Sequence, residues 1–116
     1  MGFVTNDPRG YEIICDDSQW KEHIAAAHTI MNKNQAAVKN TIESPDVIYQ
    51  SNEAPTRDVY FAKPNNTTYS NSLYTKVIVE IYEKDKTGEV VTAFPCPNIR
   101  GNIKEDGGLK YVKPKL

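Results

Sequence analysis

The hydrophobic period of this chain changes at Pro45. Before Pro45, apolar residues recur at the spacing of a helix, and after it they alternate with polar residues as on a half-buried strand. Proline itself ends a helix, because the residue before it avoids helical dihedral angles. The pattern therefore predicts N-terminal helices followed by a sheet, which is an α+β domain.

The first predicted helix covers residues 18–28 and holds the only tryptophan and both histidines of the chain. Trp20, Ile24 and Ala27 recur at i, i+4 and i+7, the spacing of one buried stripe. Asp17 or Ser18 is placed to cap the first turn.

A connector over residues 29–34 leads to a second predicted helix at residues 35–43, with Asn32 or Asn34 as its cap. One side of this helix is apolar, as packing against a sheet requires. That side carries Ala37, Val38, Thr41 and Ile42.

Five stretches alternate or are continuously apolar, and they predict strands. They cover residues 11–15, 46–50, 57–63, 73–82 and 89–94, and a short edge strand is predicted at 109–112. A hairpin loop is expected at 84–88, with Gly88 at a positive φ. The expected fold is one domain over residues 1–116, with a core from about 11 to 96 and a polar tail over 97–116. Its N-terminal helices pack on an antiparallel sheet of about four strands.

Strand alternation also predicts which side chains share a face of that sheet. Arg57 and Lys63 lie on one face of their strand, and Tyr60 lies on the other. Because the helices should cover one face, the opposite face should be partly open. Arg57, Lys63, Lys76 and Thr92 are expected to gather there.

Composition narrows the classes of function. The net charge of -1 and the pI of about 6.1 count against a nonspecific nucleic-acid binder, although a local basic groove remains compatible with them. The chain has no run of 18 apolar residues, so no membrane span is predicted. No secretory signal is predicted either, and a cytoplasmic location is therefore expected. Cys15 and Cys96 form no CxxC and are expected to be reduced thiols.

No metal or other cofactor is predicted. His23 and His28 are five residues apart and leave a helix in different directions, unlike the i, i+4 pair of a helical zinc site. The chain offers too few Cys and His residues for a structural zinc site. It also lacks GxGxxG and GxxxxGK[ST], the glycine-rich signatures of nucleotide sites.

Several short motifs occur in an order that matches a known family. They are Trp20-x-x-His23-Ile24-x-x-x-His28, Thr41-Ile42-x-x-Pro45-Asp46, Arg57-x-x-Tyr60-Phe61, Lys76-Val-Ile-Val79 and Val90-Val91-Thr92-Ala93-Phe94. Over about residues 11 to 96 the chain resembles the phage-borne branch of the barnase, EndoU, colicin and RelE-like (BECR) nucleases. The family fold, N-terminal helices before an antiparallel sheet of about four strands, agrees with the pattern above.

The resemblance implies a toxin-like, metal-independent endoribonuclease that uses the 2′-hydroxyl of its RNA substrate as nucleophile. His28 matches the helix-end histidine of the family, the first choice for general acid or base. Arg57 matches a phosphate-binding residue and Thr92 a hydroxyl donor. His23 matches a recurring helix position, and the alternative role for it is to order the helix against the sheet. In the family a proline often follows the helix-end histidine, and here Thr29 does.

Lys63, Lys76 and Tyr60 are candidate substrate-binding neighbours rather than motif matches. The implied substrate is RNA, transfer RNA among the candidates, in the cytoplasm of a host cell if a phage encodes the chain. An antitoxin or a host protein is the expected protein partner.

Other interpretations stay open. Each candidate residue also has an ordinary structural role, such as a solvated charge, a strand-forming threonine or a core aromatic. A non-catalytic phage protein on the same scaffold could bind and inhibit a host enzyme or defence system. That alternative predicts that His28, Arg57 and Thr92 lie apart or that the groove is filled. A transferase toxin acting on another phosphate-type substrate is a third class.

Overall fold

A computed structural model describes residues 2–63, 67–70 and 72–114 of the chain. Its strands are β1 (Phe3–Asn6), β2 (Glu12–Cys15), β3 (Val47–Gln50), β4 (Arg57–Ala62), β5 (Tyr74–Tyr82), β6 (Thr87–Cys96) and β7 (Leu109–Val112). Its helical segments are α1 (Asp17–Gln19), a π-helical segment (Trp20–Ala25), a 3-10 segment (Thr29–Lys33) and α2 (Gln35–Glu43). The α+β class predicted from the sequence is confirmed.

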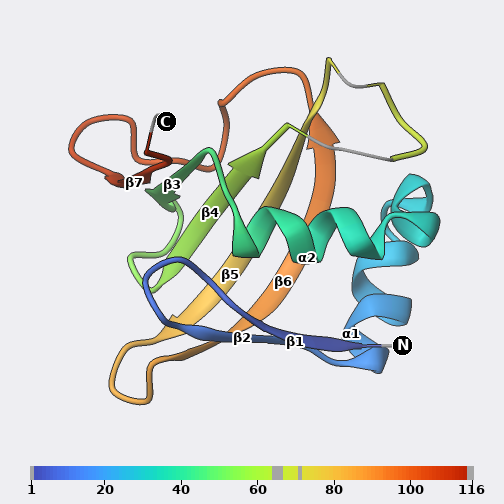
Figure 1. The fold of residues 1–116 in the computed structure, drawn as a ribbon, viewed down its shortest axis with the longest axis horizontal. Coiled ribbons are helices and arrows are strands. Elements are labelled where there is room, and N and C mark those ends of the chain that lie inside the picture. The colour runs from blue at the N-terminus through green and yellow to red at the C-terminus, as the bar shows by residue number, and fades with distance from the viewer. Residues whose placement is uncertain (1, 64–66, 71, 115–116) are drawn as a thin grey trace.

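The strands form one mixed sheet in the order β1-β2-β6-β5-β4-β3-β7 (Figure 1). The meander β3 to β6 is the predicted four-stranded core, and every pair in it is antiparallel. The prediction of about four strands is nevertheless wrong, because β1 and β2 extend the sheet beyond β6 and β7 extends it beyond β3. The β2–β6 pair is parallel, so the sheet is not purely antiparallel.

Strand β1 lies where the sequence indicated only a loose lead-in. It is four residues long and pairs with β2 in a hairpin, with Phe3 opposite Cys15 and Asn6 opposite Glu12. Val4 is 57% exposed, so β1 buries too little apolar surface to carry a clear pattern.

The first helix is shorter than predicted and wider after its first turn. The carboxylate of Asp16 accepts a hydrogen bond from the Gln19 N–H, so Asp16 is the cap, in place of the predicted Asp17 or Ser18. Trp20 and Ile24 are buried as expected. Ala27 is exposed, because the helical segment from Trp20 onward is a π-helix that ends at Ala25 and does not keep the 3.6-residue spacing.

Helix α2 has the predicted bounds and the predicted buried side. It lies across one face of the sheet, where it packs on β5 and β4 and beside β1 (Figure 1). Asn34 occupies the cap position, but its side chain makes no cap hydrogen bond to the helix. Its amide instead donates to the Ile30 carbonyl and the Thr68 hydroxyl, which ties the helix start to a distant loop.

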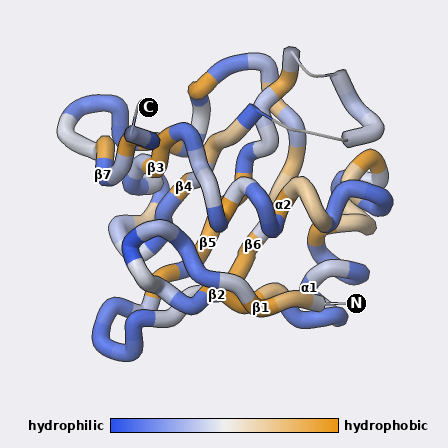
Figure 2. Tube along the Cα trace, in the orientation of Figure 1, coloured by the Kyte–Doolittle hydropathy of each residue, from blue (hydrophilic) through white to orange (hydrophobic). Residues whose placement is uncertain are grey.

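Apolar side chains pack on both faces of the sheet. The larger cluster lies under the helical segments and includes Trp20, Ile24, Val38, Tyr60 and Val77. In Figure 2, hydrophobic stretches of β5 and β6 lie beneath α2. The smaller cluster, on the opposite face, consists of Val59, Phe61, Ile78 and Ile103.

Two details of the second half differ from the prediction. In the β5–β6 hairpin the positive φ belongs to Lys86, at 59°, and not to Gly88. Gly88 lies within β6, where a Cβ atom would come within 2.9 Å of the Glu80 carbonyl oxygen. The segment expected as a polar tail supplies Ile103 to the core, and it supplies β7, as predicted, to the sheet edge.

Candidate active site

Strand register brings three of the predicted site residues onto the face opposite α2. Thr92 of β6 lies opposite Ile78, and Arg57 of β4 lies opposite Glu80 of β5. Lys76 of β5 lies between Phe61 and Phe94 on its two neighbouring strands. Because directly paired residues point to the same side, these side chains share what we call the open face, the side of β4 to β6 that bears Arg57, Lys76 and Thr92.

His28 lies in the link between the π-helical and 3-10 segments, and not at the end of a helix as predicted, and its ring reaches the edge of the open face. The Gln19 side chain of α1 donates to the Val91 carbonyl at 2.6 Å and fixes the start of the helical region against β6. The half-buried His28 ring stacks on Phe94, with ring centroids 4.8 Å apart and a 31° tilt. Phe94 follows Thr92 by two positions on β6, so the imidazole and the Thr92 hydroxyl belong to one region of the face.

The Lys76 ammonium group is enclosed and not free for a ligand. The residue is only 3% exposed, and its Nζ donates to the Arg100 carbonyl at 3.1 Å and to Asn102 Oδ1 at 2.7 Å. Burial lowers the pKa of this lysine below its ordinary value. The segment 97–104, which we call the strap, therefore covers the part of the open face around Lys76.

Arg57 lies at the far end of the open face. Its Nε donates to Glu80 Oε1 at 2.8 Å, and the two side chains are 39% and 24% exposed. Burial raises the pKa of the Glu80 carboxyl, but hydrogen bonds from Thr56 and Arg57 outweigh it, so the net shift is downward. Along β4, Arg57 is four residues from Phe61. Phe61 is paired with Lys76, and Lys76 is paired with Phe94, the residue on which His28 stacks. The structure therefore does not bring Arg57 next to His28.

The remaining predicted residues do not join His28 and Thr92. His23 is exposed on the π-helical segment. Lys63 lies beyond the end of β4, where its Nζ donates to the Ser72 carbonyl and sits 4.6 Å from the centroid of the Tyr74 ring. Tyr74 packs against Phe61 on the open face, so Lys63 is on the predicted side, at the opposite end of β4 from Arg57.

Tyr60 is fully buried on the helix side of the sheet, so it is not positioned to touch a substrate. Its hydroxyl donates to Asp7 at 2.7 Å and accepts from Arg9 at 3.0 Å. Burial and the neighbouring Asp7 raise the pKa of Tyr60 far above its ordinary value. The same Arg9 pairs with Asp58, whose other oxygen accepts from Lys110. This network joins the β1–β2 hairpin to β4 and β7.

Two residues near the site escaped the sequence prediction as contributors. Phe94 supports the His28 ring, and its position two residues after Thr92 on a strand was the available signal. Arg100 lies on the strap, and nothing in the local pattern of a segment rich in Gly, Lys and Asn predicted that it would fold back over the sheet.

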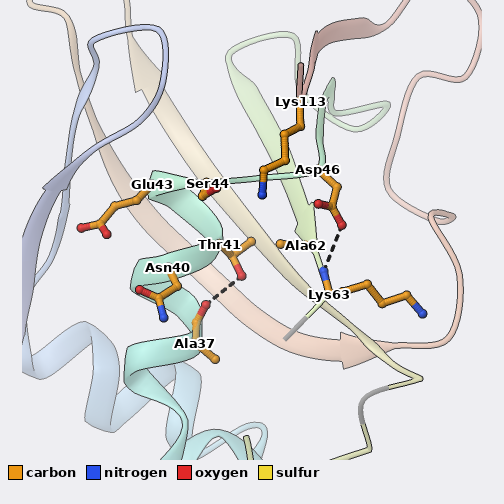
Figure 3. A pocket seen from close by; sticks show the side chains of 9 residues that line it. All are labelled: Ala37, Asn40, Thr41, Glu43, Ser44, Asp46, Ala62, Lys63 and Lys113. Carbon is orange, nitrogen blue, oxygen red and sulfur yellow. Dashed lines mark hydrogen bonds between the residues drawn. The ribbon is translucent and has the colours of Figure 1, made fainter. Parts of the chain in front are cut away.

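A separate polar hollow of about 200 Å³ lies at the C-terminal end of α2 (Figure 3). Lys113 points into it, and Asp46 accepts a hydrogen bond from the Lys63 backbone N–H at its rim. The hollow is lined by Ala37, Asn40, Thr41, Glu43, Ser44, Asp46, Ala62, Lys63 and Lys113. Its two lysines and two carboxylates balance in charge, and its α2 residues place it on the side of the sheet away from the open face.

Among the described residues, no three His, Cys, Asp or Glu side chains come close enough together to hold a metal ion. Within the same residues, no helix has the length and apolar character needed to cross a bilayer.

Comparison of the chain with protein-family models, with curated proteins and with solved structures found no match. Fold and site thus define a mixed-sheet α+β protein with a histidine beside a threonine-bearing sheet face.

Proposed function

We propose that this protein is a metal-independent endoribonuclease of the BECR type. The observation that carries the proposal is the His28 imidazole, held against Phe94 at the edge of the face that also bears the Thr92 hydroxyl. The motif order Trp20 to Phe94 supports the same assignment, and so does the antiparallel meander β3 to β6 behind it.

The chemistry needs few groups. A base removes the proton of the RNA 2′-hydroxyl, the freed oxygen attacks the adjacent phosphorus, and an acid protonates the departing 5′-oxygen. Histidine suits either proton transfer, because its ordinary pKa lies near neutrality. Thr92 would donate a hydrogen bond to a nonbridging phosphate oxygen, where negative charge builds up in the transition state.

Charge neutralisation is the part of the mechanism with the fewest free groups. Lys76 already donates to two oxygens of the strap, and Arg57 is paired with Glu80. Under the proposal Arg57 contacts the substrate away from the scissile phosphate, since its exposed position lets it exchange Glu80 for a phosphate. RNA, including transfer RNA, is the proposed substrate.

The test is incubation of the purified protein with total RNA and transfer RNA in EDTA, beside His28→Ala and His23→Ala. Cleavage that survives EDTA, is lost in a folded His28→Ala variant and persists in His23→Ala is the expected outcome. His23 is the matched control because it is a histidine five residues before His28, on the π-helical segment, and its side chain is exposed. Full activity in folded His28→Ala would refute the assignment of His28.

One observation favours a second candidate, a non-catalytic protein that binds and inhibits a host protein. The strap fills part of the open face. Two cations of that face are already engaged, Lys76 with the strap and Arg57 with Glu80. This function predicts no cleavage of any RNA by the wild-type protein, together with a host protein recovered in a pull-down whose capture is unaffected by His28→Ala.

A further inference from the structure

The strap is built around the Lys76 ammonium group. Nζ donates to a backbone carbonyl and to a side-chain oxygen of the strap, those of Arg100 and Asn102. Gly101 and Asn102 both adopt a positive φ, at 78° and 64°, which curls the backbone over the lysine. A Cβ atom on Gly101 would lie only 3.2 Å from Nζ, so the fit is close.

Further contacts fix the strap in place. Ile103 is 6% exposed and packs with Val59, Phe61 and Ile78 on the open face. The Asn102 amide donates to Glu53, and the Lys104 N–H donates to the Gln50 carbonyl. Burying a charged group costs free energy unless hydrogen bonds compensate for the lost water, and the two strap oxygens supply such bonds to the Lys76 ammonium group.

The strap carries two exposed cations, Arg100 and Lys104, and only Arg100 contacts Lys76 through its backbone. Arg100 is exposed, and no carboxylate in the described part of the chain forms an ion pair with its guanidinium group. Its carbonyl lies 3.1 Å from Lys76 Nζ, which lies 5.2 Å from the centroid of the Phe94 ring, and that ring stacks on His28. The Arg100 backbone is thus three contacts away from the imidazole.

We propose that Arg100 is a phosphate-binding residue for single-stranded RNA, and that Lys76 is a positioning residue that holds Arg100 there through the strap. This inference rests on the proposed function, because it assigns a phosphate contact to the same site. It also moves the predicted contact from Lys76 to Arg100. A guanidinium fork matches the geometry of a phosphate, and an exposed arginine without a carboxylate partner can make that contact without first breaking an ion pair.

The test measures binding separately from cleavage. The probe is a short, fluorescently labelled single-stranded RNA with 2′-O-methyl groups throughout, which cannot be cleaved by 2′-hydroxyl attack. Its anisotropy gives the Kd over a series of salt concentrations. Arg100→Gln should weaken binding about three- to fivefold and reduce the slope of log Kd against log salt by about 0.7, the contribution of one phosphate contact to a single strand.

Lys39→Gln is the matched control, because it removes the same charge from α2 on the other side of the sheet. It should leave Kd and slope near their wild-type values. If Lys39→Gln and Arg100→Gln weaken RNA binding equally, the effect comes from the net charge of the protein and not from a specific contact, and the inference is overturned.

A double-mutant cycle separates the two roles. If Lys76 acts through the strap, Lys76→Met and Lys76→Met/Arg100→Gln should have the same Kd. Additive losses would mean that Lys76 touches the RNA itself, and would overturn its positioning role. Should Lys76→Met fail to fold, Asn102→Gly replaces it, since glycine keeps the positive φ while removing one acceptor of the Lys76 ammonium group.

The outcomes distinguish this inference from the proposed function. Cleavage of RNA by the wild-type protein with unchanged binding in Arg100→Gln would refute the inference alone. Arg100-dependent binding of the probe without cleavage of any RNA would refute the nuclease function and support the inference. A wild-type protein that does not bind the probe would overturn it.

Discussion

Removing the Tyr60 hydroxyl tests the polar network on the helix side of the sheet. This hydroxyl donates to Asp7 at 2.7 Å and accepts from Arg9 at 3.0 Å, with Tyr60 fully buried and Asp7 5% exposed. Tyr60→Phe keeps the ring and its packing. The substitution therefore isolates the two hydrogen bonds that connect the β1–β2 hairpin to β4.

The expected loss follows from the charge of both partners. A hydrogen bond to a charged group contributes about 1.5–3 kcal/mol, and Asp7 keeps its bonds from Arg9 in the variant. We therefore expect the free energy of unfolding to fall by about 2 kcal/mol. With about 2.1 cal/mol/K of unfolding entropy per residue over 116 residues, this corresponds to a Tm about 8 °C lower.

The loss should also depend on pH. The pKa of Tyr60 is raised in the folded protein above its unfolded value of about 10, so its contribution is complete below pH 10 and is lost as pH rises further. Above pH 10 the wild type loses about 1.4 kcal/mol per pH unit from this group, and the phenylalanine variant does not. The difference between the two proteins should narrow to under about 1 kcal/mol at pH 11.

Urea unfolding followed by the fluorescence of Trp20, which is buried, measures both differences. Tyr82→Phe is the control, since Tyr82 is 43% exposed and should change stability little. A Tyr60→Phe loss below about 0.5 kcal/mol at neutral pH, or a difference that stays constant up to pH 11, would show that the reasoning about this network is wrong.

Two further predictions concern packing and thiol chemistry. Gly88→Ala should destabilise the protein by about 1–3 kcal/mol, because its Cβ would crowd the Glu80 carbonyl oxygen and the Ile13 side chain; unchanged urea unfolding would contradict the close approach. A thiol reagent at pH 8 should label one cysteine of the native protein, the half-exposed Cys96, and both in urea, because burial shields Cys15 and raises its pKa to about 11. Rapid labelling of both native thiols would contradict that burial.

Local patterns were sufficient where an element carries its own amphipathic signal. Helix α2 has its predicted bounds because Ala37, Val38, Thr41 and Ile42 make one apolar side and Pro45 stops the helix. Strands β4 and β5 follow their alternation in the same way. The shared face of Arg57, Lys76 and Thr92 was predictable for the same reason.

Features that depend on distant partners were not predictable. Lys76 has the pattern of a solvated charge on a strand, and it is buried only because a segment some 24 residues later folds over it. The alternation of β4 places Tyr60 on the helix-covered face, but it gives no sign that the partner of its hydroxyl is Asp7, 53 residues earlier. Strand β1 has too little apolar surface to be recognised without β2 beside it.

The most direct test of the nuclease proposal is the chemistry of the RNA ends. An RNA cleaved by the purified protein in EDTA should carry 2′,3′-cyclic phosphate at the new end, and DNA of the same sequence should remain intact, because only RNA supplies the 2′-hydroxyl nucleophile. The same products should be missing with folded His28→Ala. Fragments that end in a 5′-phosphate and a free 3′-hydroxyl, or equal cleavage of the DNA, would contradict the proposed mechanism.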